Sequence, residues 1–272
     1  MMKLSCSSQS LDHLFMQGKV TLFDFADYCA DVLGVTYIEV EDKHFASTDP
    51  AYVAELKAYF DKKNLKVCNI AFDCSFGYPT AQQNRAQIDR AKEWMPIGKA
   101  LGSPNFRLFA GWMGGPDPEI HKKGPAVQKP ETAWAEMVEC VQELCDYGKD
   151  MGLSIVIENH NHGGFLSASK DVLRLFDEVK RDNLSLLLDT GNYVDGIDGI
   201  RATTHLVKKH VHLKVNQVAE DGHDTVYDLP LILEVLTQSG YDGTLFIEYE
   251  GEQDEKIYIK KVTDFVRACL QE

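Results

Sequence analysis

The sequence predicts an α/β protein with a closed parallel sheet, and three observations support this prediction. Short aliphatic or β-branched runs alternate with amphipathic helical patterns along the chain, which indicates parallel strands joined by helices. Eight such runs occur within 272 residues, which is close to the usual size of one (β/α)₈ barrel. No G-x-G-x-x-G follows the first run, which weighs against an open doubly wound sheet. We therefore expect residues 1–272 to form one (β/α)₈ barrel domain.

The eight predicted strands are rich in Val, Ile, Leu and Phe. They are Lys3–Ser7, Val35–Val40, Leu65–Phe72, Asn105–Ala110, Leu153–Asn159, Leu184–Asp189, His210–Val215 and Thr244–Tyr249. Amphipathic patterns between them predict helices, one of which begins at a Thr21-x-x-Asp24 capping box. Another helix is expected from Asp228, because Pro230 would lie in its first turn, and a last one near 256–270.

The predicted connections differ in length according to their direction. Helix-to-strand turns are short and carry a glycine, as at Gly34 and Gly240, where a helix end favours a left-handed residue. Strand-to-helix loops are long and cover 72–81, 111–130, 160–167 and 216–227. In a (β/α)₈ barrel these loops gather at the carboxyl ends of the strands, so we expect the functional site there.

Composition narrows the possible partners. The formal net charge is −14, and no basic cluster is present, so binding to nucleic acid or to an anionic membrane is not expected. No apolar run is long enough to cross a bilayer, and the N-terminus does not resemble a signal peptide. Seven scattered cysteines without a C-x-x-C pair are typical of reduced thiols. We expect a cytoplasmic protein that acts on a small molecule.

Four neighbouring strands end in residues that ligate metals. The apolar runs of strands five, six and eight lead to Glu158, Asp189 and Glu248, and strand seven carries His210 and His212. Three carboxylates brought together would repel one another unless a cation binds between them. One strand-ending acid is usually a helix cap or an ion-pair partner, but three such acids and a histidine on four consecutive strands favour a divalent metal site. Three oxygen ligands and one imidazole are compatible with Mn²⁺, Mg²⁺, Zn²⁺ or Fe²⁺.

The strings IENHNHGG, LLLDTGNY, HVHLKV and FIEYEG occur in this order, and the chain also contains KLSCSS and GVTYIEV near its start. Together they resemble the sugar phosphate isomerase/epimerase family, whose members are xylose-isomerase-like TIM barrels. The resemblance covers the whole chain. It implies one divalent metal, with Mn²⁺ expected first and Mg²⁺, Zn²⁺, Co²⁺ or Fe²⁺ as alternatives. The implied ligands are Glu158, Asp189, His212 and Glu248; His210, which would face the same side as His212, is then an interior residue.

The resemblance also implies a reaction. The metal would polarise the carbonyl of a keto sugar or polyol, and Glu158 and Glu248 would move the α-proton through a metal-bound enediolate. We expect an isomerase or epimerase with these two catalytic carboxylates, and the family implies a possible homo-oligomer. Candidate substrate contacts are His160, Asn192, Lys214, Arg107 and Trp112.

Two positions depart from the family pattern, and three alternatives stay open. Val215 replaces the Asp of H-x-K-D, and Asn192 replaces the His of D-x-x-H. The same scaffold supports dehydratases of inosose- or dehydroshikimate-like substrates, which also begin with α-proton removal. It also supports abasic-site endonucleases, but these need several metals and a basic surface, against which the charge of −14 argues. A non-catalytic sugar-binding subunit is the third alternative, although a sensor would have no need of four complete ligands.

Overall fold

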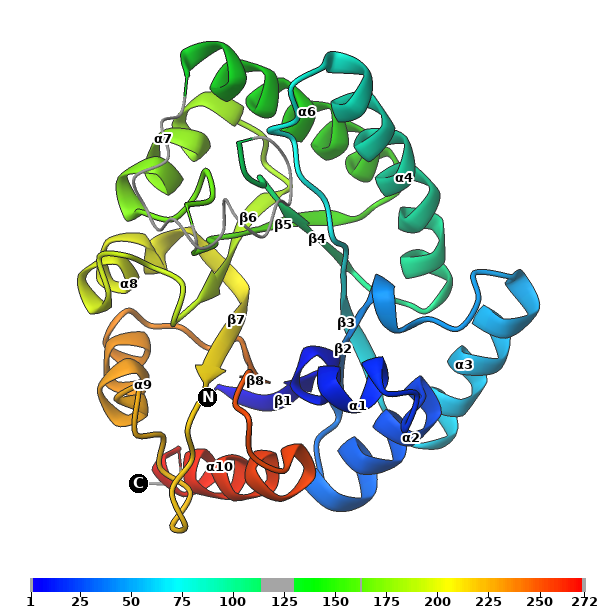
Figure 1. Cartoon of the computed structure of the whole chain (residues 1–272), viewed down its shortest axis with the longest axis vertical. Coiled ribbons are helices and arrows are strands. Elements are labelled where there is room, and N and C mark those ends of the chain that lie inside the picture. Colours follow the sequence, from blue (N-terminus) through cyan, green and yellow to red (C-terminus); the bar gives the residue numbers. More distant parts are fainter. Residues whose placement is uncertain (1, 114–129, 162, 271–272) are drawn as a thin grey trace.

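The computed structural model describes residues 2–113, 130–161 and 163–270 and has eight parallel strands in a closed barrel. β1 pairs with both β2 and β8, which closes the sheet, and helices surround it (Figure 1). The predicted barrel is therefore confirmed. The strands are β1 (Lys3–Ser7), β2 (Tyr37–Glu41), β3 (Lys66–Ala71), β4 (Asn105–Phe109), β5 (Ser154–Glu158), β6 (Leu184–Asp189), β7 (Val207–Val215) and β8 (Thr244–Tyr249).

Strand positions agree with the sequence pattern to within a few residues at each end. The main difference is β7, which begins at Val207 rather than at His210. Lys208 and Lys209 are exposed, so this part of the strand has no hydrophobic signal. Val207 nevertheless pairs with Leu186 of β6, so its place in the sheet follows from backbone pairing alone.

The outer layer consists of helices that mostly follow the predicted patterns. They are α1 (Asp12–Met16), α2 (Leu22–Asp27), α3 (Pro50–Lys62), α4 (Ala81–Ala100), α6 (Glu131–Asp150), α7 (Ser169–Val179), α8 (Ile197–Thr203), α9 (Leu229–Gln238) and α10 (Glu255–Cys269). Short 3₁₀ turns are η1 (Ser8–Leu11), η3 (Asp42–His44) and η4 (Thr204–Leu206), and η2 (Tyr28–Leu33) is a π-helix that extends α2.

Local signals explain where several helices begin and end. The predicted capping box is present, because Thr21 and Asp24 each bond the other's backbone N–H. The helix predicted from Asp228 is present as α9, and the Asp228 side chain accepts from the N–H of Leu231 at its start. η2 ends at Gly34, whose φ of 63° is the left-handed conformation that glycine adopts without strain.

The strand-to-helix loops meet over the carboxyl ends of the strands. The β3–α4 and β4–α6 loops touch where Gly77 faces the carbonyl of Trp112; a Cβ at Gly77 would lie 2.0 Å from that oxygen. Gly77 therefore permits the two loops to close over one side of the barrel mouth. Residues 114–129 of the predicted 111–130 loop and His162 lie outside the described residues. Within the described ranges, no helix is long and apolar enough to span a membrane.

Candidate metal centre and substrate pocket

The four predicted ligands meet at the carboxyl end of the barrel. Glu158, Asp189, His212 and Glu248 are all buried, and each offers one ligand atom within 4.8 Å of the others. Parallel register explains the convergence, because Asp189 pairs with His212 across β6 and β7. Each carboxylate comes at or near the end of an apolar strand, so four neighbouring strands deliver their polar side chains to one place. A group of this composition and spacing could hold one metal ion.

The imidazole of His212 turns its Nδ1 atom toward the acids. Nδ1 lies 3.0 Å from Glu248 Oε1 and 3.5 Å from Glu158 Oε1. It has no hydrogen-bond partner within the described ranges. Burial alone would lower the pKa of His212, but the carboxylates of Glu248 and Glu39 raise it well above its usual value. A lone pair at Nδ1, freed of its proton, would face the space between the carboxylates, which fits a metal ligand.

The three carboxylates differ in their protonation equilibria. Burial raises the pKa of Glu158, and burial together with the neighbouring Glu248 raises that of Asp189 well above its usual value. Burial acts on Glu248 in the same direction, but His212 and Lys214 outweigh it and hold its pKa well below the ordinary range. Without a cation, burial therefore favours the protonated forms of Glu158 and Asp189, whereas a divalent ion would favour the charged form of all three carboxylates.

A buried asparagine fixes the backbone at the end of β6. The Asn159 side chain donates to the carbonyl of Asp189 at 2.9 Å and accepts from its N–H at 2.8 Å. The Asn192 side chain donates to the carbonyl of Asn159 at 3.2 Å, and Asn192 is 2% exposed and outside the pocket wall. Its proposed contact with substrate stays a prediction, since the structure gives it a supporting position next to Asn159.

Lys214 follows His212 by two residues on β7, so both side chains lie on the same face of the strand, and Lys214 lies among the acids. Its Nζ is 3.0 Å from Asp189 Oδ2, 2.6 Å from Glu248 Oε2 and 2.9 Å from Glu250 Oε1. Gly191 makes room for it, because a Cβ there would be 2.5 Å from Cγ of Lys214. Burial opposes its charge, but the acids raise the pKa of Lys214 well above its usual value, so it is an ammonium donor facing the pocket.

Arg107 forms the opposite wall, where it links strands β2 and β5. Its Nη1 donates to Glu158 at 3.2 Å and its Nη2 to Glu41 at 3.1 Å. The guanidinium lies 3.8 Å from the ring centroid of Phe109, which limits its movement. Burial raises the pKa of Glu41 to about 8 despite Lys43 and Arg107. Glu41 was not predicted, although it ends β2 as Glu158 ends β5, so the same signal could have found it.

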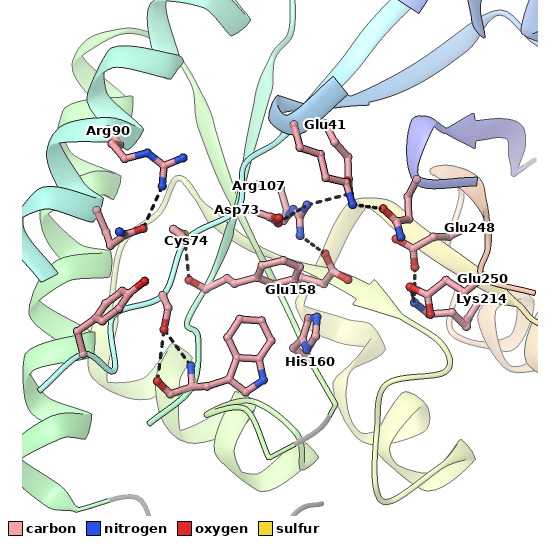
Figure 2. Close-up of a pocket in the computed structure, with 17 residues that line it drawn as sticks. Glu41, Asp73, Cys74, Arg90, Arg107, Glu158, His160, Lys214, Glu248 and Glu250 are labelled. Atoms are coloured by element: carbon pink, nitrogen blue, oxygen red, sulfur yellow. Dashed lines mark hydrogen bonds and ion pairs between the residues drawn. The ribbon is translucent and has the colours of Figure 1, made fainter. Parts of the chain in front are cut away.

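Aromatic groups line one side of the cavity, which has a volume of about 400 Å³ (Figure 2). The half-buried ring of His160 packs edge-on against Phe109 and Trp112, with centroids 4.4 and 4.6 Å apart. Burial and the charge of Lys214 lower the pKa of His160 to about 3, so it is neutral at physiological pH. The structure thus brings His160, Trp112, Arg107 and Lys214 together with Glu158 and Glu248 in one pocket of a size suited to a small ligand.

Comparison with known proteins identifies the family. The model of the xylose isomerase-like TIM barrel family matches residues 26–269. This chain belongs to that family.

Inosose dehydratase of Lacticaseibacillus casei is 24% identical over 264 residues, which cover 87% of this chain and 84% of that protein. Among solved structures, 3-keto-D-glucoside 4-epimerase of E. coli has a TM-score of 0.77 at 15% identity, covering 99% of this chain and 100% of that one. L-ribulose 3-epimerase has a TM-score of 0.76 at 18% identity, covering 100% and 95%. The structural matches show the shared fold.

Proposed function

We propose that this protein is a divalent-metal-dependent isomerase or epimerase that moves a proton next to the carbonyl of a keto sugar or polyol. The convergence of Glu158, Asp189, His212 and Glu248 at the mouth of the barrel is the observation that supports this most directly. The metal, for which Mn²⁺ is our first expectation, would supply Lewis-acid stabilisation of negative charge on the substrate oxygens. The epimerases among the structures with this fold are consistent with the proposal.

Glu158 and Glu248 would bind the metal and would also transfer the proton. Glu158 projects from β5 and Glu248 from β8, so they reach the pocket from separated strands. Their pKa values are shifted in opposite directions, upward for buried Glu158 and downward for Glu248, where His212 and Lys214 outweigh burial. These shifts describe the metal-free site; with a divalent ion bound both groups would be charged, and each could accept a proton and later return it. Asp189 and His212 would only hold the metal.

The charges of the pocket wall favour an unphosphorylated substrate. Lys43, Arg107 and Lys214 line the pocket, and each lies within 3.2 Å of a carboxylate oxygen. Arg90 is 3.6 Å from Asp42. Every one of these cations already faces an acid, so a phosphate would have to compete for it. Hydroxyl groups, in contrast, could hydrogen-bond to these paired groups without displacing any charge.

The decisive experiment is proton exchange with solvent. Purified protein loaded with Mn²⁺ would be incubated in D₂O with a panel of ketoses and cyclic keto-polyols, and deuterium at carbon measured by mass spectrometry and NMR. We expect exchange at the α carbon that disappears in Glu158→Gln and in Glu248→Gln, each assayed at a Mn²⁺ concentration at which elemental analysis finds the metal bound. Full turnover by both variants would contradict the two-carboxylate mechanism, and exchange without added metal would contradict the metal dependence.

A dehydratase of an inosose-like substrate is the second candidate. The observation in its favour is the similarity to inosose dehydratase over 84% of that protein's length. Dehydration begins with the same α-proton removal and then requires an acid for the departing hydroxyl. His160 is unsuited because its low pKa keeps it neutral, whereas the ammonium of Lys214 faces the pocket. Loss of about 18 mass units, the mass of one water molecule, from a cyclic keto-polyol would assign the dehydratase. A ketose that exchanges its proton but stays intact would assign the epimerase or isomerase.

A further inference from the structure

A buried carboxylate outside the proposed ligand set lies directly next to the candidate metal centre. Glu39 of β2 is fully buried, and its Oε1 lies 2.8 Å from Nε2 of His212. Its Oε2 lies 2.8 Å from Nε2 of His210. Ser7 donates to Oε1 and Asn69 donates to Oε2, both at 2.7 Å. Both oxygens of Glu39 therefore accept hydrogen bonds, as an ionised carboxylate does.

These contacts decide which nitrogen of His212 can bind a metal. A carboxylate that only accepts requires a hydrogen on Nε2 of His212, and a neutral imidazole then has its lone pair on Nδ1. Nδ1 is the atom near Glu158 and Glu248, at 3.5 and 3.0 Å. The opposite tautomer would direct an N–H at the metal position and two lone pairs at each other across the Glu39 contact.

We propose that Glu39 is a positioning residue that holds His212 in the tautomer and ring orientation needed to bind the metal through Nδ1. This inference rests on the metal site of the proposed function. Glu39 does not touch the substrate pocket itself, because it is absent from the pocket wall and fully buried. Carboxylates that accept from the second nitrogen of a metal-bound histidine commonly raise metal affinity about 10- to 100-fold.

The alternative use of the same residues would be a second metal site, since Glu39, His210 and His212 also have ligand atoms within 4.8 Å of one another. Two features oppose it. His212 would have to bind one ion through each ring nitrogen, which requires an imidazolate. Ser7 and Asn69 already direct their donors at the oxygens of Glu39 that a cation would need.

The test is metal binding, measured apart from turnover. Metal-free wild type and Glu39→Gln would be titrated with Mn²⁺ by calorimetry, and bound metal counted by elemental analysis. Glutamine has nearly the same shape but no charge, and it can present an N–H to His212. We expect wild type to bind one ion per chain and Glu39→Gln to bind it about 10- to 100-fold more weakly.

Glu255→Gln is the matched control. Glu255 is also a buried carboxylate, 6% exposed, that accepts the N–H groups of His13 and Leu14 at 2.9 and 3.2 Å, away from the pocket. It should bind Mn²⁺ as wild type does. Thermal melting of all three metal-free proteins separates lost affinity from lost folding.

A spectroscopic measurement follows the tautomer directly. In zinc-loaded protein labelled with ¹⁵N at histidine, we expect a slowly exchanging, downfield Nε2–H from His212 in wild type. In Glu39→Gln this resonance should move upfield or be replaced by the resonances of a mixture of tautomers.

If Glu39→Gln kept wild-type affinity and the same resonance, the positioning role would be wrong, but the proposed metal site would be unaffected. Two ions per wild-type chain would overturn it in favour of the second site. A wild type that bound no metal would overturn the proposed function as well.

Discussion

The two halves of the barrel contribute differently to the candidate site. Strands β5 to β8 supply all four proposed ligands, from Glu158 to Glu248. Strands β1 to β4 supply none of these four, but they provide groups that contact the ligands: Glu39 at His212 and Arg107 at Glu158. We therefore expect strands β5 to β8 to bind the metal, and strands β1 to β4 to hold the ligand side chains in the orientation that binding requires.

The largest effect should follow a change in the ligand half. Asp189→Asn removes the charge from a buried ligand, while Asn159 can still hold the backbone on both sides of residue 189. We expect Mn²⁺ affinity to fall by more than the roughly 100-fold that loss of an outer partner can cost, with loss of turnover. Calorimetry and elemental analysis would measure it. Retained affinity within tenfold would remove Asp189 from the ligand set.

The next effect concerns stability and tests the supporting half. Arg107→Met leaves the carboxylates of Glu41 and Glu158 without their buried guanidinium partner. Removing one member of a buried ion pair typically costs about 3–5 kcal/mol, so the free energy of unfolding should fall by that amount in urea denaturation above about pH 8, where the Glu41 carboxyl is ionised.

A double variant shows whether unpaired charge is the cause. Adding Glu41→Gln to Arg107→Met removes one of the stranded carboxylates and should recover part of the lost stability. If the two changes were simply additive, Arg107 would stabilise the fold through packing on Phe109 rather than through its ion pairs.

The pH dependence of metal binding tests the ligand half again. Although burial opposes it, the surrounding carboxylates raise the pKa of His212 well above its usual value, so the metal-free site holds a proton that the metal must displace. Metal affinity should therefore fall as pH falls below that pKa, by about tenfold per pH unit for each proton released. Calorimetry in buffers of different ionisation enthalpy counts these protons. Affinity independent of pH between about 6 and 8 would mean that Nδ1 is already free.

The smallest effect is expected at the aromatic wall. His160→Gln removes a ring that packs on Phe109 and Trp112. By analogy with aromatic pairs, we expect KM to rise roughly two- to tenfold. The pH profile between about 5 and 8 should not change, because burial already lowers the pKa of His160 to about 3. A lost inflection near neutral pH in the variant would instead identify His160 as a proton carrier.

The sequence alone predicted the part of the site that follows the strand pattern. Glu158, Asp189 and Glu248 each come at or near the end of an apolar run, and parallel strands bring their carboxyl ends to one face, so convergence followed from periodicity. The choice of His212 over His210 came from family resemblance. In the structure, Nδ1 of His212 faces Glu158 and Glu248, whereas His210 contacts Glu39.

Other features depended on tertiary structure. The contact from Glu39 to His212 joins residues 173 positions apart, and no local pattern encodes such a distance. The predicted contact of Asn192 with substrate stays a prediction, and the hydrogen bond from its side chain to Asn159 became visible only in the structure, because a residue just beyond a strand can turn inward or outward with the loop. The sequence thus determined the barrel and the end at which polar groups collect. Only packing across the barrel decided which nitrogen and which oxygen atoms face one another, since side-chain orientation is set by partners that the chain brings together on folding.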